Sequence, residues 1–585
     1  MSALINALDI HTSKQIGENG HAEYGWSNSI RERILQFSFQ LTRTDEKGLH
    51  KLASVLNDIL NTLKAQHNSS SDQVVTAEYL ILLYKMIGQT RDIVDGKGEC
   101  SLTYMMIYTW YNFYPELAYH AIKCLVDFGD YGETHQYGSW KDIKYFCDYC
   151  RKQGCPIEHL LIQYAITIIN RQINSDYANL ISNSDEISLA GKWVPREKSG
   201  RFGWMYEALA CNYLPQYIES ARWSENQHKS RESAILKCKT EYRTVLSALN
   251  RKIDTLQIKQ CEKNWSKIDF NKVTSVSLSK QKKAFLNVTK KGEQRFPNNE
   301  DRIVCAEHFN SHIQKAITGE VEIKGKRIGL ENFTKQAIDL LLNYRSSSFL
   351  IESELLNSQW RDNSSQTCAL ENMIAMVDVS GSMNGDPLNA AIALGIRVAE
   401  KSKLGKRIMT FSNSPKWVNL EGQEDFVSMV KTLQTAEWGM NTNFDAALNM
   451  ILDAIVESKM EPEDVEGLTL AIFSDMQMDQ ANNDKNVLFD RIKTKYADAG
   501  IRVKGKPYKP PHILFWNLRS TSGFPTLSTQ QNASMMSGFS PAMLNLFCEQ
   551  GIESLQACTP WSLFIKSLEN ERYSIMEVKA REFFM

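Results

Sequence analysis

The last third of the chain opens with an apolar strand that ends in oxygen-bearing side chains. The run NMIAMVDVSGSM extends from Asn372 to Met383, and its polar end carries Asp378, Ser380 and Ser382. A carboxylate and two hydroxyls on one tight turn are hard oxygen ligands, the type that Mg²⁺, Mn²⁺ and Ca²⁺ prefer. The motif therefore predicts a site for one divalent ion, Mg²⁺ first among them, at the carboxyl end of a buried strand.

Two further segments supply the rest of this predicted site. Thr442 lies in WGMNTNFDAAL, and Asp475 follows the apolar run LTLAIFS. Because such runs indicate buried parallel strands, their carboxyl ends should meet at one edge of an α/β sheet, where ligands bind. The alternative is a turn that only caps the helix predicted from 387 to about 400. A cap accounts for one of the three segments, so the sequence favours a metal site.

The same residues match the metal-ion-dependent adhesion site of von Willebrand factor A domains, and residues 372–585 resemble such a domain. One departure is that Gly439, Met440 and Asn441 precede Thr442, where most family members carry Gly-Gly. The resemblance implies a Rossmann-like α/β fold in which hydroxyl oxygens bind the cation directly and carboxylates often act through water. It also implies an open position on the ion for an acidic group of a protein partner.

An enzymatic interpretation of the strand end is a phosphatase of the haloacid-dehalogenase type, with Asp378 as the nucleophile beside Mg²⁺. That chemistry needs a second Asp two residues later, where this sequence has Ser380. No Gly-x-Ser-x-Gly elbow, His-Glu-x-x-His or phosphate-loop motif occurs elsewhere in the sequence. We therefore expect a protein that is not an enzyme and takes no small-molecule substrate, with a Mg-dependent phosphatase as an alternative.

Composition and charge give no sign of a specialised environment. Of 585 residues, 43% are hydrophobic and 23% are charged, and the net charge is −1. This balance is typical of a globular protein and gives no general attraction to nucleic acid or membranes. No apolar run approaches the ~18 residues that span a bilayer, and the twelve cysteines are scattered. We expect an intracellular protein, in the cytoplasm or nucleus, or in the host cytoplasm or virion for a viral protein.

One short segment concentrates soft metal ligands, namely Cys147, Cys150, Cys155 and His159. These side chains could bind a structural zinc ion, although their order differs from that of a zinc knuckle and no second Cys pair follows. Residues 141–152 have helical spacing, and buried cysteines are common in helices. The sequence favours buried thiols and leaves the zinc site open.

The hydrophobic spacing before residue 345 is that of helices, and HLLIQYAITIIN (159–170) is apolar on nearly every side. No strict repeat period is present. We predict four segments: a flexible N-terminus (1–19), a solenoid-like α-helical repeat domain (20–345), a helical connector (346–371) and the α/β domain (372–585). Strands are predicted near 373–378, 407–412, 467–474 and 511–517, and exposed loops at 68–72 and 362–366.

Several short strings are richer in Gly, Trp and charge than packing requires. They are RDIVDGKGECSLTYMMIYTW (91–110), YGSWKDI (137–143), GKWVPREKSGRFGW (191–204) and residues 261–287, with PHILFWNLRS (511–520) and SGFSPAMLNLF (537–547) in the C-terminal domain. Together with the domain layout, these strings resemble the proteins of plants, fungi and giant viruses grouped as domain of unknown function 2828. That family is largely uncharacterised, so the likeness implies a layout and leaves function open.

The layout is also similar, more distantly, to the Ro ribonucleoprotein. There a ring of helical repeats, the TROVE module, binds small and misfolded RNAs and is closed by a von Willebrand A-like domain. Arg91, Asp92, Gly96, Lys97 and Gly98 match a motif in the early repeats of such proteins, an acidic residue after Arg followed by Gly-Lys-Gly. Likeness of fold does not fix function.

Two basic stretches with interleaved aromatic residues could contact RNA phosphates and stack on bases. Their candidate RNA-binding residues are Lys192, Arg196, Lys198, Arg201, Lys282, Lys283, Lys290 and Lys291. The alternative is that the charges are solvated and the rings hold loops to helices. We predict a non-enzymatic, divalent-metal-binding interaction protein, with a protein partner that offers an acidic residue and with small or structured RNA as a second partner. The alternative is a protein–protein adhesion or assembly module without RNA.

Overall fold

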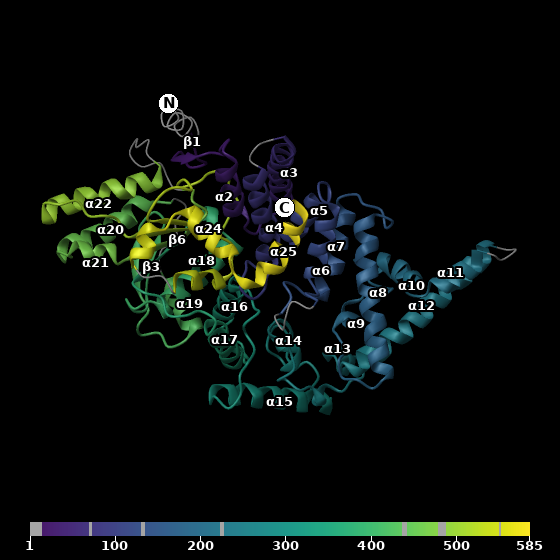
Figure 1. Cartoon of the computed structure of the whole chain (residues 1–585). Helices are drawn as coiled ribbons and strands as arrows, with labels where there is room; N and C mark the ends of the chain where they lie inside the picture. Colours follow the sequence, from purple (N-terminus) through teal and green to yellow (C-terminus); the bar gives the residue numbers. More distant parts are fainter. Residues whose placement is uncertain are drawn as a thin grey trace.

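In the computed structural model, a helical N-terminal part adjoins a C-terminal part built around a six-stranded, mostly parallel sheet (Figure 1). The structure describes residues 14–69, 73–129, 135–222, 227–435, 442–477, 487–548 and 552–585. None of the helices within these ranges is long and apolar enough to cross a membrane.

The N-terminal part is helical almost throughout, as the hydrophobic spacing predicts. Its helices are α2 (Ile30–Gln40), α3 (Glu46–Ser69), α4 (Gln73–Arg91), α5 (Cys100–Tyr111), α6 (Pro115–Cys124), α7 (Trp140–Lys152), α8 (Leu160–Ile181), α9 (Ala190–Trp193), η1 (Gly203–Met205), α10 (Tyr206–Tyr213), α11 (Pro215–Arg222), α12 (Gln227–Lys252), α13 (Leu256–Cys261), η2 (Trp265–Lys267), α14 (Ser275–Phe285), α15 (Glu300–Ile317), α16 (Leu330–Leu342) and α17 (Phe349–Ser364). Consecutive helices from α3 to α6 pack against one another, as do α7 and α8.

The C-terminal part contains β3 (Met373–Asp378), η3 (Gly381–Met383), α18 (Asp386–Lys401), β4 (Arg407–Phe411), β5 (Lys416–Asn419), α19 (Phe426–Gln434), α20 (Phe444–Glu457), α21 (Pro462–Glu466), β6 (Thr469–Ser474), α22 (Leu488–Lys504), β7 (His512–Asn517), β8 (Ala533–Ser537), η4 (Pro541–Phe547), α23 (Ile552–Ala557), α24 (Pro560–Leu568), η5 (Glu571–Tyr573) and α25 (Ser574–Phe584). The strand order is β5-β4-β3-β6-β7-β8, and only β5 runs antiparallel to its neighbour.

The four predicted strands are present as β3, β4, β6 and β7, while β5 and β8 escape prediction. β5 is a short edge strand whose sequence, KWVN, is partly exposed along its length. β8 reads ASMMS, which contains no β-branched residue although all of it is buried. Neither has the apolar, β-branched pattern that identifies a strand from local sequence.

The two faces of the sheet belong to different hydrophobic cores. On β3, Ile374 and Met376 join a core that continues into the N-terminal helices, whereas Ala375 and Val377 join a second core with α16 and α18. This alternation follows from the two-residue period of a strand. The helix α16, predicted within the repeat domain that ends at 345, instead packs on α18 and α19 of the α/β part, because its amphipathic pattern does not reveal which layer it faces.

The prediction of an exposed loop at 362–366 is wrong. Residues 362–364 form the end of α17, and Asn363 is buried. Its amide nitrogen contacts the carbonyl oxygens of Gly325 and Ile328 at 3.2 and 3.3 Å, and its oxygen accepts from Arg397 at 2.8 Å. The polar composition of this segment suggested exposure to solvent, whereas in the structure buried groups form the hydrogen bonds of the Asn363 amide. Of the other predicted loop, residues 70–72 lie outside the described ranges.

Both ends of the described chain cross to the other half of the molecule. Strands β1 (Lys14–Ile16) and β2 (Ala22–Tyr24) form a hairpin that is bridged to Phe524 of the C-terminal part. In return, α25 packs on α4 of the helical part (Figure 1). Of the predicted flexible N-terminus, residues 1–13 lie outside the described ranges and 14–16 form β1. Each end of the described chain therefore packs against the part formed by the other end.

Candidate metal centre

The predicted metal ligands lie where the winding of the sheet reverses. From β3 the chain adds β4 and β5 on one side, and it then crosses to add β6, β7 and β8 on the other. Asp378 ends β3, and Asp475 directly follows β6, its neighbour across the reversal. In open α/β sheets, ligands bind in the crevice at such a switch point, outside the carboxyl ends of the strands.

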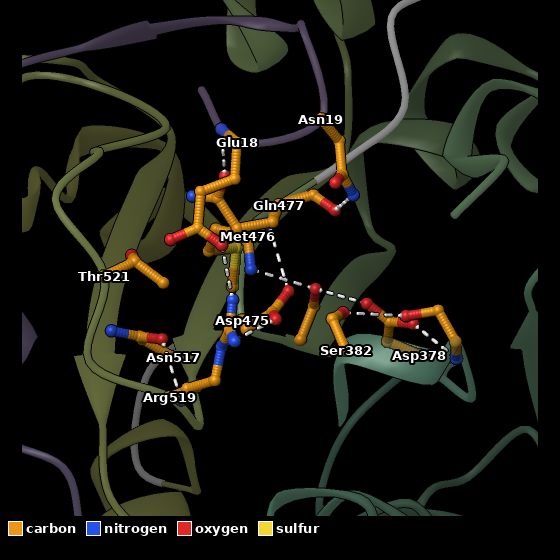
Figure 2. Close-up of polar contacts among 12 residues, drawn as sticks. Glu18, Asn19, Asp378, Ser382, Asp475, Met476, Gln477, Asn517, Arg519 and Thr521 are labelled. Atoms are coloured by element: carbon orange, nitrogen blue, oxygen red, sulfur yellow. Dashed lines mark hydrogen bonds and ion pairs between the residues drawn. The ribbon is translucent and has the colours of Figure 1, made fainter. Parts of the chain in front are cut away.

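Asp378 is completely buried and oriented by two hydrogen bonds (Figure 2). Its Oδ1 accepts from the backbone N–H of Ser380 at 2.9 Å, and its Oδ2 accepts from the hydroxyl of Ser474 at 2.6 Å. The hydroxyl oxygens of Ser380 and Ser382 lie 3.2 Å apart. The structure thus brings the carboxylate and both hydroxyls of the predicted motif together.

Asp475 is also completely buried, at the other side of the same crevice. Its Oδ1 accepts from the backbone N–H of Gln477 at 3.1 Å, and the Ser382 hydroxyl of the first turn acts to lower the pKa of this carboxyl. Met476, between Asp475 and Gln477, has a φ of 64°, a left-handed backbone conformation that costs a residue with a side chain about 1–2 kcal/mol. This strained kink turns Asp475 and Gln477 out of the strand.

The two buried carboxylates perturb one another electrostatically. Burial, with the nearby charge of Asp475, raises the pKa of Asp378 to about 7. Burial also raises the pKa of Asp475, although the guanidinium of Arg519 opposes that rise. Because both carboxylates are taken out of water, a divalent cation between them would relieve an unfavourable charge pair. The donor set of two carboxylates and two hydroxyls fits such an ion.

Thr442, the fifth predicted ligand, is buried at the same edge of the sheet. The next residue, Asn443, donates its backbone N–H to the carbonyl of Ser412 at 2.9 Å, and Ser412 directly follows β4. Residues 439–441, whose sequence departs from the family pattern, lie outside the described ranges. Among the described residues, no group of three or more His, Cys, Asp or Glu side chains could hold a metal ion, so hydroxyl ligands would be essential.

Two charged residues at this site were missed from the sequence. The Nε of Arg519, in the loop after β7, lies 3.0 Å from Oδ2 of Asp475, without the alignment of a hydrogen bond. The Nη2 of the same guanidinium donates to Glu18 of the N-terminal hairpin at 2.8 Å (Figure 2). The position of Arg519 just past a strand end could have suggested it, whereas Glu18 carries no local signal.

The four soft ligands do not form a zinc site. Cys147 and Cys150 are buried on α7, whereas the side chain of His159 caps α8 by accepting from the N–H of Leu161 at 3.3 Å. Cys155 donates to the hydroxyl of Tyr108 at 3.6 Å. Burial raises the pKa of both α7 thiols well above the ordinary value. The structure therefore agrees with the interpretation that the sequence favoured, in which the α7 cysteines are buried thiols.

The first basic stretch forms a surface together with α7. The Nζ of Lys144 lies 4.9 Å from the ring centre of Trp193 and 5.1 Å from that of Phe202, and Arg201 lies over Tyr145 at 4.8 Å. Of the predicted contacts, Arg196, Lys198 and Arg201 are exposed, and Lys192 is half-buried. We call residues 192–204 with the adjoining face of α7 the basic–aromatic surface. The α7 residues were missed because about fifty residues separate them from the stretch.

The second basic stretch is largely committed to the fold. Lys282 is only 12% exposed and lies 3.2 Å from Glu352, which is itself 3% exposed. Lys283 donates to the carbonyl of Lys290 at 3.2 Å. The prediction that Lys282 lies open to an RNA backbone is therefore wrong, because its charge balances a buried carboxylate from α17. Lys290 and Lys291 are exposed.

The charged motif of residues 91–98 is also part of the fold. Arg91 pairs with Asp142 through two hydrogen bonds of 2.8 Å, and Asp92 accepts from Arg572. Lys97 is buried and donates to the hydroxyl of Ser537 at 2.7 Å. Asp92 and Lys97 join the helical part to the C-terminal part, whereas Arg91 pairs within the helical part, so all three charges are committed to the fold.

Comparisons with known proteins identify families of unknown function. Residues 161–362 match a family model described as "Domain of unknown function (DUF2828)", and residues 372–579 match one described as "Domain of unknown function (DUF7788)". The chain is also 27% identical over 576 residues to "Uncharacterized protein L728" of Acanthamoeba polyphaga mimivirus, an alignment that covers 94% of this chain and 86% of that protein. The predicted likeness to the 2828 family is confirmed over 161–362.

Proposed function

We propose that this protein is a non-enzymatic interaction protein that depends on a divalent metal ion. In this proposal the C-terminal part is a von Willebrand factor A-like domain in which Asp378, Ser380, Ser382, Thr442 and Asp475 hold one ion, preferably Mg²⁺. The observation that carries the proposal is the pair of buried carboxylates, Asp378 and Asp475, with the hydroxyls of Ser380 and Ser382 beside Asp378, at the switch point of the sheet.

The sheet supports the fold assignment. Renumbered from β3, its strand order is 3-2-1-4-5-6 with an antiparallel edge strand, and helices cover both faces. The carboxyl ends of β3 and β6 supply four of the candidate ligands, and the segment before α20, which bonds to Ser412 after β4, supplies Thr442. This arrangement is the one expected of a domain that presents a metal at the edge of its sheet.

Each side chain has a distinct role in the proposed site. The hydroxyls of Ser380 and Ser382 supply neutral oxygens, while Asp378 and Asp475 supply the negative charge that attracts a divalent ion. A bound ion that keeps an open position would attract an acidic side chain of a partner protein. Asp378 has both oxygens engaged by Ser380 and Ser474, a role that suits orientation better than nucleophilic attack.

We expect Mg²⁺ to raise the melting temperature of the full-length protein, because an ion that binds only the folded state stabilises it by mass action. Asp378→Ala should abolish the shift. The full chain is the appropriate sample, since α25 packs on the helical part. Asp453→Ala, which removes an exposed carboxylate of α20, is the matched control and should keep the shift. A shift of equal size in wild type and Asp378→Ala would contradict the assignment.

The Mg²⁺ response should also be larger at pH 8 than at pH 6. Burial raises the pKa of Asp378 to about 7, so at pH 6 the ion must displace a proton before it binds. Without metal, the pH dependence of the unfolding free energy has the opposite sign. The Asp378 contribution to folded-state stability is lost as pH rises from the unfolded pKa of about 3.9 toward 7. A Mg²⁺ response independent of pH over this range would argue that Asp378 is not the group involved.

RNA binding is a second candidate function, supported by the basic–aromatic surface. There, Lys144, Arg151 and Arg201 each lie over an aromatic ring, and cations beside rings are the groups that contact a phosphate backbone while bases stack. Arg196 and Lys198 are exposed at its edge. Because the surface lies on the helical part, RNA binding should be independent of the proposed metal site.

Replacing Arg196 and Lys198 by alanine should weaken binding of single-stranded RNA and make it less sensitive to salt. Each lost phosphate contact reduces the slope of log affinity against log salt concentration by about 0.7, so the double variant should lose about 1.4. The control is Lys493→Ala with Arg502→Ala on α22, at the opposite end of the molecule (Figure 1). The hypothesis fails if no RNA binds at low salt, or if both double variants change the slope equally.

A further inference from the structure

An N-terminal strap, residues 14–24, contacts Gln477 and Arg519 beside the proposed metal site. Its two strands are joined by a turn that carries Glu18 and Asn19. The backbone groups of Tyr24 and Phe524 exchange hydrogen bonds of 3.0 and 2.9 Å, which fix one end of the strap to the loop after β7.

The turn of the strap is docked on the residue that follows the metal-site loop. The backbone N–H of Glu18 donates to Oε1 of Gln477 at 2.8 Å, and Asn19 donates to the Gln477 carbonyl at 2.9 Å. In return, the Gln477 amide donates to Glu23 of the strap at 3.2 Å. Gln477 lies two residues beyond Asp475, so the strap is positioned on the site itself (Figure 2).

Arg519 connects the strap to the buried carboxylate of the site. Its guanidinium lies between Asp475, 3.0 Å from Nε, and Glu18, 2.8 Å from Nη2. A cation that bridges a buried site carboxylate and a carboxylate from outside the domain reproduces the charge pattern that a divalent ion and an acidic partner would form there. The chain therefore supplies both the cation and the acidic group from within itself.

We propose that Glu18 is the resting, intrachain occupant of the position that an acidic partner takes, and that Arg519 is the internal cation that holds it there. A divalent ion that binds Asp475 competes with Arg519, and its binding frees Glu18 and loosens the strap. This inference rests on the proposed metal site. It identifies the first ligand that any protein partner of that site must displace.

The burial of the three groups favours such an exchange. Asp475 is completely buried, whereas the side chains of Arg519 and Glu18 are 35% and 59% exposed. Exposed ion pairs contribute little to stability, so the outer half of the bridge opens at low cost. Oδ2 of Asp475 has no aligned hydrogen bond to lose, and a stronger cation can replace the guanidinium.

The test compares Mg²⁺ affinity and strap mobility in full-length variants. Arg519→Gln removes the competing cation and should bind Mg²⁺ at least about tenfold more tightly than wild type, by calorimetric titration. Arg407→Gln is the control, because it removes a cation of similar exposure from an ion pair of 2.8 Å with Glu421 elsewhere in the domain. Its Mg²⁺ affinity should equal that of wild type.

Hydrogen exchange of the amides in residues 14–24 provides the second measurement. Exchange should accelerate when Mg²⁺ is added to wild type, and Glu18→Gln should show fast exchange already without metal. Wild type and Arg519→Gln binding Mg²⁺ with equal affinity, or strap exchange that ignores Mg²⁺, would overturn the inference while the metal site stands. If neither protein binds Mg²⁺, the metal site fails and the competition fails with it.

Discussion

Asp142→Ala is expected to destabilise the folded protein by about 3–5 kcal/mol, the usual cost of removing one partner of a buried ion pair. Asp142 is completely buried and accepts two hydrogen bonds of 2.8 Å from Arg91 and one of 2.6 Å from the Tyr104 hydroxyl. It also accepts from the backbone N–H of Ser139 at the start of α7. Without it, the guanidinium of Arg91 is left buried with no counter-ion. Urea unfolding followed by circular dichroism measures the loss.

The matched control for this variant is Asp127→Ala. Asp127 lies 3.6 Å from Lys123 with half of its side chain exposed, so its removal should cost less than about 1 kcal/mol. Equal losses in the two variants would show that the Arg91–Asp142 pair contributes no more than a surface pair.

Acidification should bring the stabilities of wild type and Asp142→Ala closer together. Burial raises the pKa of Asp142, but Arg91 and the other hydrogen bonds outweigh it and hold the pKa below its ordinary value. Stabilisation by this carboxylate is therefore complete above the unfolded pKa, about 3.9, and is lost as pH falls through the lower folded pKa. Wild type should lose this contribution in acid, and Asp142→Ala should lack that part of the pH dependence.

Arg572→Ala is expected to have the second large effect, a loss of about 3 kcal/mol or more. The Nε of Arg572 donates to the completely buried Asp92 at 2.7 Å, and its carbonyl accepts from the Tyr137 hydroxyl at 2.7 Å. Removal of the guanidinium leaves the Asp92 charge without its principal partner. Because this pair ties the C-terminal segment to the end of α4, hydrogen exchange in α25 should accelerate along with the drop in unfolding free energy.

A neighbouring arginine provides the control for Arg572. Arg581 pairs with Glu78 at 2.8 Å, but both side chains are about two-fifths exposed, so Arg581→Ala should cost less than about 1 kcal/mol. If the two variants lose the same stability, burial is not what gives the Arg572 pair its strength.

These ion pairs explain why the charge-rich strings were difficult to interpret. Residues 91–110 and 137–143 contain more charge than local packing requires, and the sequence alone assigned that charge no partner. In the structure Arg91 of the first string pairs with Asp142 of the second, and both are buried. A sequence records that a charge is present, but only the tertiary structure shows whether its partner is water, a ligand or another side chain.

The sequence by itself determined the local parts of the site. The apolar runs that form β3 and β6, and the oxygen-bearing residues Asp378 and Asp475 that follow them, were predicted at their observed positions. The signals were local, since a buried strand and the turn that ends it are encoded within about ten residues. The helices of the N-terminal part were predictable for the same reason.

Only the tertiary structure decided which distant groups meet these elements. Glu18 reaches Arg519 across 501 positions of sequence, and Lys282 meets Glu352 across 70. The helix α16 packs on α18 and α19 of the α/β part, although its amphipathic pattern would equally suit the helical part. Hydrophobic periodicity specifies which face of an element is buried, whereas the identity of the surface that covers it depends on how the whole chain packs.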